Sequence, residues 1–221
     1  MKLKKTLICI VLAASLSASA LAAAVPFSDL DSISEKDKIL ALQEKGIING
    51  MGGDLFDPQG NLTAAQAVKL IVKTTGINID NIRFIKAPQV TDYFKNGHDG
   101  AWYADSLIIA AMNDIGLPKD LDPDSKINRE QFLYYLVSAI EKRYNIPTIK
   151  MYIQITDEDQ ITVTYSGAIQ RALLYGLTTL DASGNFSPKA DITRAQAAAM
   201  IFNAVELLKD RPLAEAENST N

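Results

Sequence analysis

Three similar stretches of sequence decide the fold: Leu62–Gln66 (LTAAQ), Ile127–Gln131 (INREQ) and Ile192–Gln196 (ITRAQ). The second and the third each begin 65 residues after the one before. A proline lies five residues before the Thr or Asn of each stretch, and a large apolar residue lies two residues before that proline. Three repetitions in one register indicate an internal repeat, which is typical of a protein built from equivalent units.

Each stretch has the composition of a helix start. Its second residue is Thr or Asn, whose side chain can cap a free backbone N–H in the first turn. Three residues later comes a Gln that can reach back to the capping residue, as in a capping box. The pairs are Thr63 with Gln66, Asn128 with Gln131, and Thr193 with Gln196. Apolar residues at helical spacing follow, so each stretch predicts the start of an amphipathic helix.

A second predicted helix lies upstream of each capped one. Its apolar residues are followed by Gly46, Gly116 or Gly176. A glycine there is expected to adopt the left-handed conformation that ends a helix. Each copy opens with an apolar residue, a hydroxyl residue and an aspartate, which we interpret as a turn or cap residue: Asp29, Asp92 and Asp157.

The first residues have the pattern of a signal peptide. Lys2, Lys4 and Lys5 precede a short apolar core, and small residues follow, so we expect residues 1–24 to be removed on export. The single cysteine, Cys9, lies in this leader, so the mature chain would contain no disulfide. Its three lysines leave 19 basic against 26 acidic residues, which lowers the formal net charge from −4 to −7.

These features exclude several classes of function. An acidic chain is unsuited to nucleic acid, whose binding depends on neutralising phosphates. After removal of the leader we expect no insertion into a membrane. His98 is the only histidine, and the aspartates from Asp120 to Asp124 lack the glycine and the glutamate of a calcium loop, so we predict no metal site and no cofactor. No catalytic motif is present, and the chain is expected not to be an enzyme.

The repeated residues resemble the S-layer homology family. Its repeats share an F-x-D opening, a G-[IL]-[IL]-x-G turn, an F-x-P and an I-T-R-A-E helix start. The corresponding stretches here are Phe27–Asp29, Gly46–Gly50, Phe56–Pro58 and Ile192–Gln196. The resemblance implies a mostly α fold, with three helix-loop-helix repeats in a pseudo-threefold arrangement and room for short strands in the linkers, such as 151–155. We place the repeats at 25–76, 88–143 and 153–208, followed by a flexible tail at 209–221.

The resemblance also implies a function. In that family, three repeats hold proteins to the bacterial envelope by binding secondary cell-wall polysaccharide, often pyruvylated, in grooves between repeats. The residue associated with the ligand's carboxylate maps to Arg129 and Arg194, the early helical tryptophan to Trp102, and the turn glycine to Gly50. A guanidinium suits a carboxylate because it can donate two parallel hydrogen bonds.

Two readings of the function follow from these residues. The first is a secreted protein of the cell wall or S-layer surface that binds the wall polysaccharide. The first copy has Ala64 at the arginine position, so one or two grooves are expected to bind. The alternative is a small structural or scaffolding surface protein, whose degenerate repeats contact other surface proteins.

Overall fold

The computed structural model describes residues 26–147 and 150–214, so the expected signal peptide and residues 215–221 of the expected tail lie outside the described residues. Within the described ranges the structure is mostly α-helical, as predicted, and its β-pairing consists of isolated bridges. The elements are α1 (Lys36–Glu44), α2 (Ala64–Thr75), η1 (Val90–Asp92), α3 (Ala104–Met112), α4 (Arg129–Arg143), η2 (Glu158–Gln160), α5 (Val163–Leu174) and α6 (Arg194–Leu208).

The three long helices start as the sequence predicts. Thr63, Asn128 and Thr193 are the N-caps of α2, α4 and α6, and each forms a complete capping box with the glutamine three residues later. At Asn128, for example, the side-chain oxygen accepts the Gln131 N–H at 2.9 Å, and the Gln131 side chain accepts the Asn128 N–H at 3.1 Å. These caps satisfy backbone donors that the first helical turn would otherwise leave free.

The predicted ends of the upstream helices are confirmed in two copies and wrong in one. Gly46 and Gly176 follow the C-caps of α1 and α5 with φ of 65° and 70°. In the middle copy the residue after the C-cap is Asp114, with φ of 49°, and Gly116 lies two residues further on. An aspartate can take this place because short polar side chains tolerate the left-handed conformation better than other non-glycine residues.

A closed ring of backbone hydrogen bonds joins the three helix starts. The Leu62 N–H donates to the Ile192 carbonyl at 3.3 Å, Ile192 donates to Ile127 at 3.1 Å, and Ile127 donates to Leu62 at 3.2 Å. All three side chains are buried. Because each of the three equivalent residues is both donor and acceptor, the ring has approximate threefold symmetry.

The same cyclic order governs the first turns of the capped helices. The Arg194 and Ala195 N–H groups of α6 donate to the carbonyls of Gly60 and Pro58, in the loop that precedes α2. The starts of α2 and α4 are bonded in the same way to the loops that precede α4 and α6. Each helix start is therefore completed by the loop of another copy.

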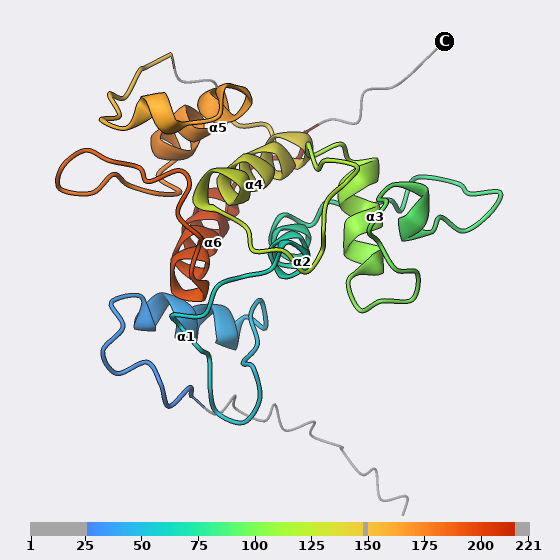
Figure 1. Cartoon of the computed structure of the whole chain (residues 1–221), viewed down its shortest axis with the longest axis horizontal. Coiled ribbons are helices and arrows are strands. Elements are labelled where there is room, and N and C mark those ends of the chain that lie inside the picture. Colours follow the sequence, from blue (N-terminus) through green and yellow to red (C-terminus); the bar gives the residue numbers. More distant parts are fainter. Residues whose placement is uncertain (1–25, 148–149, 215–221) are drawn as a thin grey trace, which may run out of the picture.

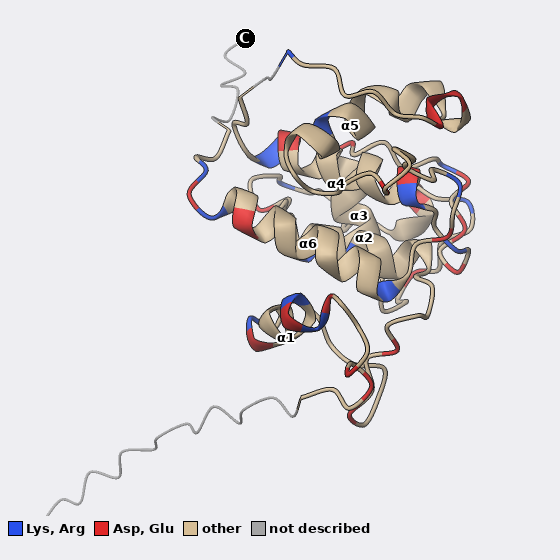
Figure 2. Cartoon of the chain, turned by 90° about the vertical axis from the view of Figure 1, so that its left-hand side faces the viewer, with Lys and Arg blue, Asp and Glu red and all other residues tan. Residues whose placement is uncertain are grey.

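The shorter helices follow the same cyclic order, because each packs on the long helix of another copy. α1 packs on α6, α3 on α2 and α5 on α4, while α2 also contacts α4 and α6 (Figure 1). Each short helix thus covers the long helix of another copy, and the first copy closes the circle by covering the last. Figure 2 shows α1 lying beside α6, with acidic and basic residues along α1.

The linkers contain no strand within the described residues. The segment 151–155 is not a β-strand; instead the Gln170 side-chain amide of α5 bonds to both the N–H and the carbonyl of Ile153, at 3.0 and 2.8 Å. The start of the expected tail is paired with the end of α4, where Ala214 N–H donates to the Arg143 carbonyl at 2.9 Å.

Removing a cap tests this account of the helix starts. Thr193→Ala deletes the acceptor for the Gln196 N–H and is expected to lower the free energy of unfolding by roughly 0.5–2 kcal/mol. Urea denaturation followed by circular dichroism measures the change. Thr164→Ala, at an exposed position inside α5, is the control and should leave stability within about 0.5 kcal/mol of the parent. Equal losses in the two variants would contradict the assigned role of the cap.

Candidate functional site

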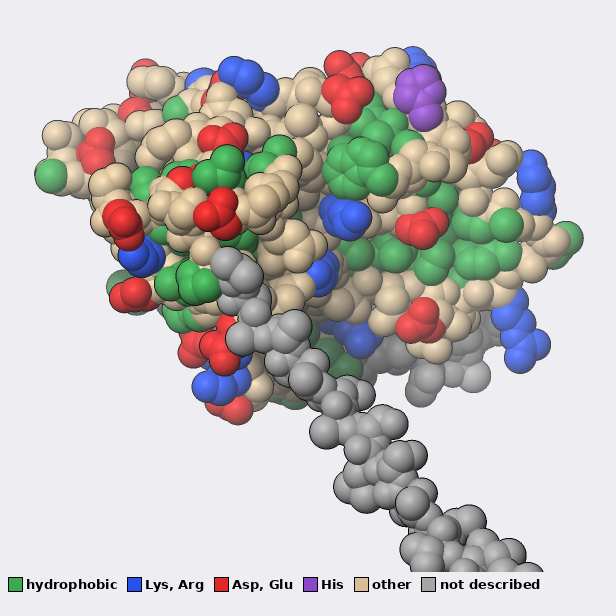
Figure 3. Space-filling view, turned by 90° about the horizontal axis from the view of Figure 1, so that it is seen from below, with side chains coloured by type: hydrophobic (Ala, Val, Ile, Leu, Met, Phe, Trp, Pro, Cys, Tyr) green, Lys and Arg blue, Asp and Glu red, His purple; other side chains and the backbone are tan. Residues whose placement is uncertain are grey.

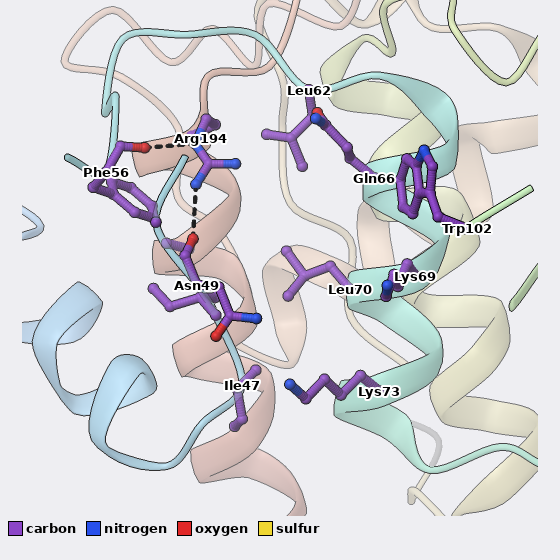
Figure 4. Close-up of a pocket in the computed structure, with 13 residues that line it drawn as sticks. Ile47, Asn49, Phe56, Leu62, Gln66, Lys69, Leu70, Lys73, Trp102 and Arg194 are labelled. Atoms are coloured by element: carbon purple, nitrogen blue, oxygen red, sulfur yellow. Dashed lines mark hydrogen bonds between the residues drawn. The ribbon is translucent and has the colours of Figure 1, made fainter. Parts of the chain in front are cut away.

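The Arg194 side chain folds back from the start of α6 across the loop of the first copy. Its Nε donates to the Phe56 carbonyl at 2.7 Å, and one terminal nitrogen donates to the Asn49 carbonyl at 3.1 Å. The guanidinium carbon lies 4.5 Å from the centre of the Phe56 ring, a cation–π geometry. Figure 4 shows the remaining nitrogen directed across the pocket toward α2. The loop therefore fixes the orientation of this cation.

The loop that receives Arg194 is itself held by Asp29, which the sequence predicted only as a turn or cap residue. The Asp29 carboxylate accepts the N–H groups of Phe56 and Asp57 at 2.9 and 2.7 Å. Slight burial raises the pKa of Asp29, but these backbone donors outweigh it and leave the pKa below its usual value. Burial lowers the pKa of the Arg194 guanidinium, while the Asp57 and Asp29 carboxylates act in the opposite direction.

A pocket of about 280 Å³ lies between the loop of the first copy, the exposed side of α2 and the start of α6. Its cations are Arg194, Lys69 and Lys73, and no acidic residue lines it. Figure 3 shows basic side chains along the hollow between two lobes of the molecule. In a chain with an excess of acidic residues, this pocket is a local concentration of positive charge, which suits an anionic ligand.

Trp102 closes one end of the same pocket. It lies just before α3 and contacts α2, where the Lys69 ammonium is 5.0 Å from the centre of its ring. The Trp102 side chain is 56% exposed, so it is not a core residue. An exposed aromatic face beside cations is a surface on which a sugar ring can stack, with the cations placed for acidic substituents.

Arg129 occupies the equivalent position at the start of α4. Its Nε donates to the Phe186 carbonyl at 3.0 Å and its guanidinium carbon lies 5.2 Å from the Phe186 ring. The adjoining pocket is larger, about 610 Å³, but is also lined by Glu35 and Asp181. Ala199 and Asn203 replace the two lysines of α2, because they lie 130 residues after Lys69 and Lys73. This groove retains the arginine and has Lys38 as a second cation, but the two acidic residues balance their positive charge.

The third groove, at the start of α2, has neither an arginine nor an open pocket. Ala64 stands where the other copies have arginine and is buried. Tyr134, the counterpart of Lys69, lies against Gly116 at the place that a Cβ atom there would occupy, and its ring stacks on Tyr165 at 4.5 Å between centres. Aromatic packing therefore fills this groove.

Gly50 lies in the pocket wall, where its lack of a side chain allows close packing of the loop. A Cβ atom there would lie 2.6 Å from the Leu55 carbonyl oxygen and 2.8 Å from the Phe27 ring. Three of the four residues predicted for binding, Arg194, Trp102 and Gly50, thus line one pocket, and Arg129 lies in another.

Comparison with known proteins agrees with this layout. A family model of the S-layer homology domain matches residues 26–68 and 154–198. The chain therefore contains two regions that match the S-layer homology domain. These domains anchor proteins to the cell wall, so the chain is a component of the cell envelope surface. The matched regions contain Gly50 and Arg194; the middle segment takes the remaining place in the ring.

Three enzymes are similar to most of this chain. They are an exoglucanase, XynX, of Acetivibrio thermocellus (27% identity, 82% of this chain), an amylopullulanase of Thermoanaerobacterium thermosulfurigenes (26%, 81%) and an endoglucanase of a Bacillus species (25%, 80%). The alignments cover only 16%, 9% and 18% of those proteins. The chain thus spans less than a fifth of the length of these relatives, and the catalytic names describe the whole enzymes.

Two further features of the described residues concern metal ions and membranes. No cluster of three or more histidine, cysteine, aspartate or glutamate side chains suited to a metal ion occurs in the ranges 26–147 and 150–214. Over the same ranges, none of the helices combines the length and the apolar character that a membrane crossing requires.

Lys69 and Lys73 are the site residues that the sequence analysis missed. Both lie on the exposed side of α2, one turn apart, where a lysine is ordinarily a solvated surface residue. The equivalent residues in α4 are Tyr134 and Ser138, so the sequence shows that these positions differ but not that the two lysines line a pocket. A charge present in one copy and absent from the others indicates that the grooves differ.

The close packing at Gly50 can be tested directly. Gly50→Ala places a methyl group against the Leu55 carbonyl and the Phe27 ring and is expected to lower the melting temperature by several degrees, because overpacking costs about 1–3 kcal/mol. Differential scanning calorimetry measures the shift. Gly167→Ala, inside α5, is the matched control and should be neutral or stabilising. A Gly50→Ala protein as stable as the parent would show that the loop has room to move.

Proposed function

We propose that this protein attaches noncovalently to the cell wall by binding an acidic secondary polysaccharide in the pocket of Arg194, Lys69, Lys73 and Trp102. The observation that carries the proposal is the absence of acidic residues among those that line this pocket, in a chain with 26 acidic and 22 basic residues. A carboxylate-bearing sugar, such as a pyruvylated one, would meet the unpaired nitrogen of Arg194 and one of the lysines. Trp102 would contact the sugar ring.

The proposal includes three repeats with unequal roles. The middle segment, 88–143, is a third S-layer homology repeat whose helix α4 and loop complete the fold. The Arg194 pocket is the principal site, the Arg129 pocket is a weaker second one, and the Tyr134 groove is closed. The chain itself acts as a binding module and not as a catalyst, exported through the leader at residues 1–24.

Cosedimentation with purified cell walls tests the proposal. The protein is expected to pellet with walls that retain the secondary polymer and to remain in solution when the polymer has been extracted. Equal pelleting with both preparations would contradict glycan recognition and favour contacts with other wall components.

Substitutions separate the two arginine pockets. Arg194→Gln removes a charged donor and is expected to weaken wall binding about tenfold to a hundredfold, because hydrogen bonds to charged groups contribute roughly 1.5–3 kcal/mol. Arg129→Gln is the matched control, since it removes the same kind of contact from the less basic groove, and should have a smaller effect. Binding isotherms on polymer-bearing walls measure both.

A second variant distinguishes loss of binding from loss of folding, because Arg194 also bonds to the loop of the first copy. Lys69→Gln/Lys73→Gln leaves the bonds of Arg194 to the loop intact and should also weaken binding. It removes only exposed contacts, of Lys73 with the Gly46 carbonyl and of Lys69 with Trp102, so the fall in melting temperature should be small. The fluorescence of Trp102, the only tryptophan, should change when soluble polymer is added. Wild-type affinity in the double-lysine variant would contradict the assignment of the pocket.

A further inference from the structure

The linker between α2 and α3 exposes apolar and basic side chains together. Residues 81–87, here called the basic linker, are all exposed. Ile82, Phe84 and Ile85 expose 43, 40 and 110% of their surface, and Arg83 and Lys86 lie among them. Neither cation takes part in an ion pair within the described residues. Single exposed apolar residues are ordinary, but three within four positions form a patch that water solvates poorly.

The linker that leads into α5, taken together with the first residue of that helix, has the complementary composition. In residues 151–163, here called the acidic linker, Met151, Tyr152 and Val163 are 67, 64 and 90% exposed. The Tyr152 O–H donates to the Glu158 carboxylate, which keeps an acid beside the exposed ring, and Asp159 is exposed next to it. The Gln170 bonds to Ile153 hold this segment along α5. Its apolar side chains are therefore presented from a fixed backbone.

The two linkers lie at different ends of the molecule. In Figure 1 the segment that leads from α2 to α3 is at the right, while α5 and the segment before it are at the upper left. Figure 3 shows apolar and basic side chains together at that right-hand end. One chain cannot bring its own two linkers together without unfolding the helices between them, but a second copy can supply the partner surface.

We propose that copies of this chain associate head to tail, with the basic linker of one copy against the acidic linker of the next. Such a contact uses two different surfaces, so each pair leaves one linker of each kind free, and the association continues into open strings. The apolar side chains supply burial, while Arg83 and Lys86 face Glu158 and Asp159 to set the direction. This association is independent of the groove proposed for polysaccharide.

Sedimentation velocity of the purified protein over micromolar to millimolar concentrations tests the association. The average mass is expected to rise with concentration past that of a dimer, and to fall on addition of salt, which screens the charged part of the contact. A monomer throughout this range would overturn the proposal, and so would an association that stops at dimers.

Complementation between variants tests its head-to-tail character. Phe84→Ser/Ile85→Ser disables the basic linker, and Met151→Ser/Tyr152→Ser disables the acidic one. Each variant alone should remain monomeric, whereas an equimolar mixture should form dimers that grow no further, because only one intact contact is available. Mixtures that stay monomeric while the parent protein associates would overturn the head-to-tail assignment.

Two controls complete the experiment. Met51→Ser/Leu55→Ser removes two apolar side chains of similar exposure, 57 and 49%, outside both linkers, and should associate as the parent does. Vesicles of anionic phospholipid should not pellet the protein. Pelleting that depends on Phe84 and Ile85, without self-association, would assign the basic linker to a lipid surface and overturn the proposal.

Discussion

The structure depends on the ring of three backbone hydrogen bonds among Leu62, Ile127 and Ile192. Each of these residues immediately precedes an N-cap, so the ring brings together the starts of α2, α4 and α6. Buried backbone groups must be paired, and here each copy can pair its own only with the help of the other two. Two further sets of contacts follow the same cyclic order: each short helix packs on the long helix of another copy, and each loop bonds to the helix start of another copy.

The same constraint explains why the pockets lie between copies. A helix start bonded to the loop of another copy places its first side chain over that loop. Arg194 therefore reaches Phe56 and Arg129 reaches Phe186, although 138 and 57 residues separate the partners in the chain. The differences among the grooves arise from side chains and, in the middle copy, also from a shorter loop, since Pro123 follows Gly116 by 7 positions where the other copies have 12. Lysine, alanine and tyrosine at equivalent places in α2, α6 and α4 leave one basic pocket, one mixed pocket and one filled groove.

Local features were predictable from the sequence because they depend on neighbouring residues. The caps at Thr63, Asn128 and Thr193, and the glycine stops at Gly46 and Gly176, are of this kind. Gly116 misled the prediction because Asp114 adopts the left-handed conformation in its place. The contribution of Lys69 and Lys73 could not be read from the sequence, since it requires the loop of the first copy and Trp102 to be placed across from α2. The buried Glu130, which bonds to Thr162 ahead of α5 and to Lys189, likewise depends on long-range packing.

The packing of α1 on α6 has a mechanical meaning for a protein of the cell surface. Tension passed on from neighbouring parts of a polypeptide would enter through the segments that flank α1 and α6. Here the first described helix packs on the last, and residues 212–214 form backbone hydrogen bonds with the end of α4 and the residues after it. A force applied to either of these segments would have to break these outer contacts before it reached the central ring of hydrogen bonds. The centre of the molecule would therefore unfold last.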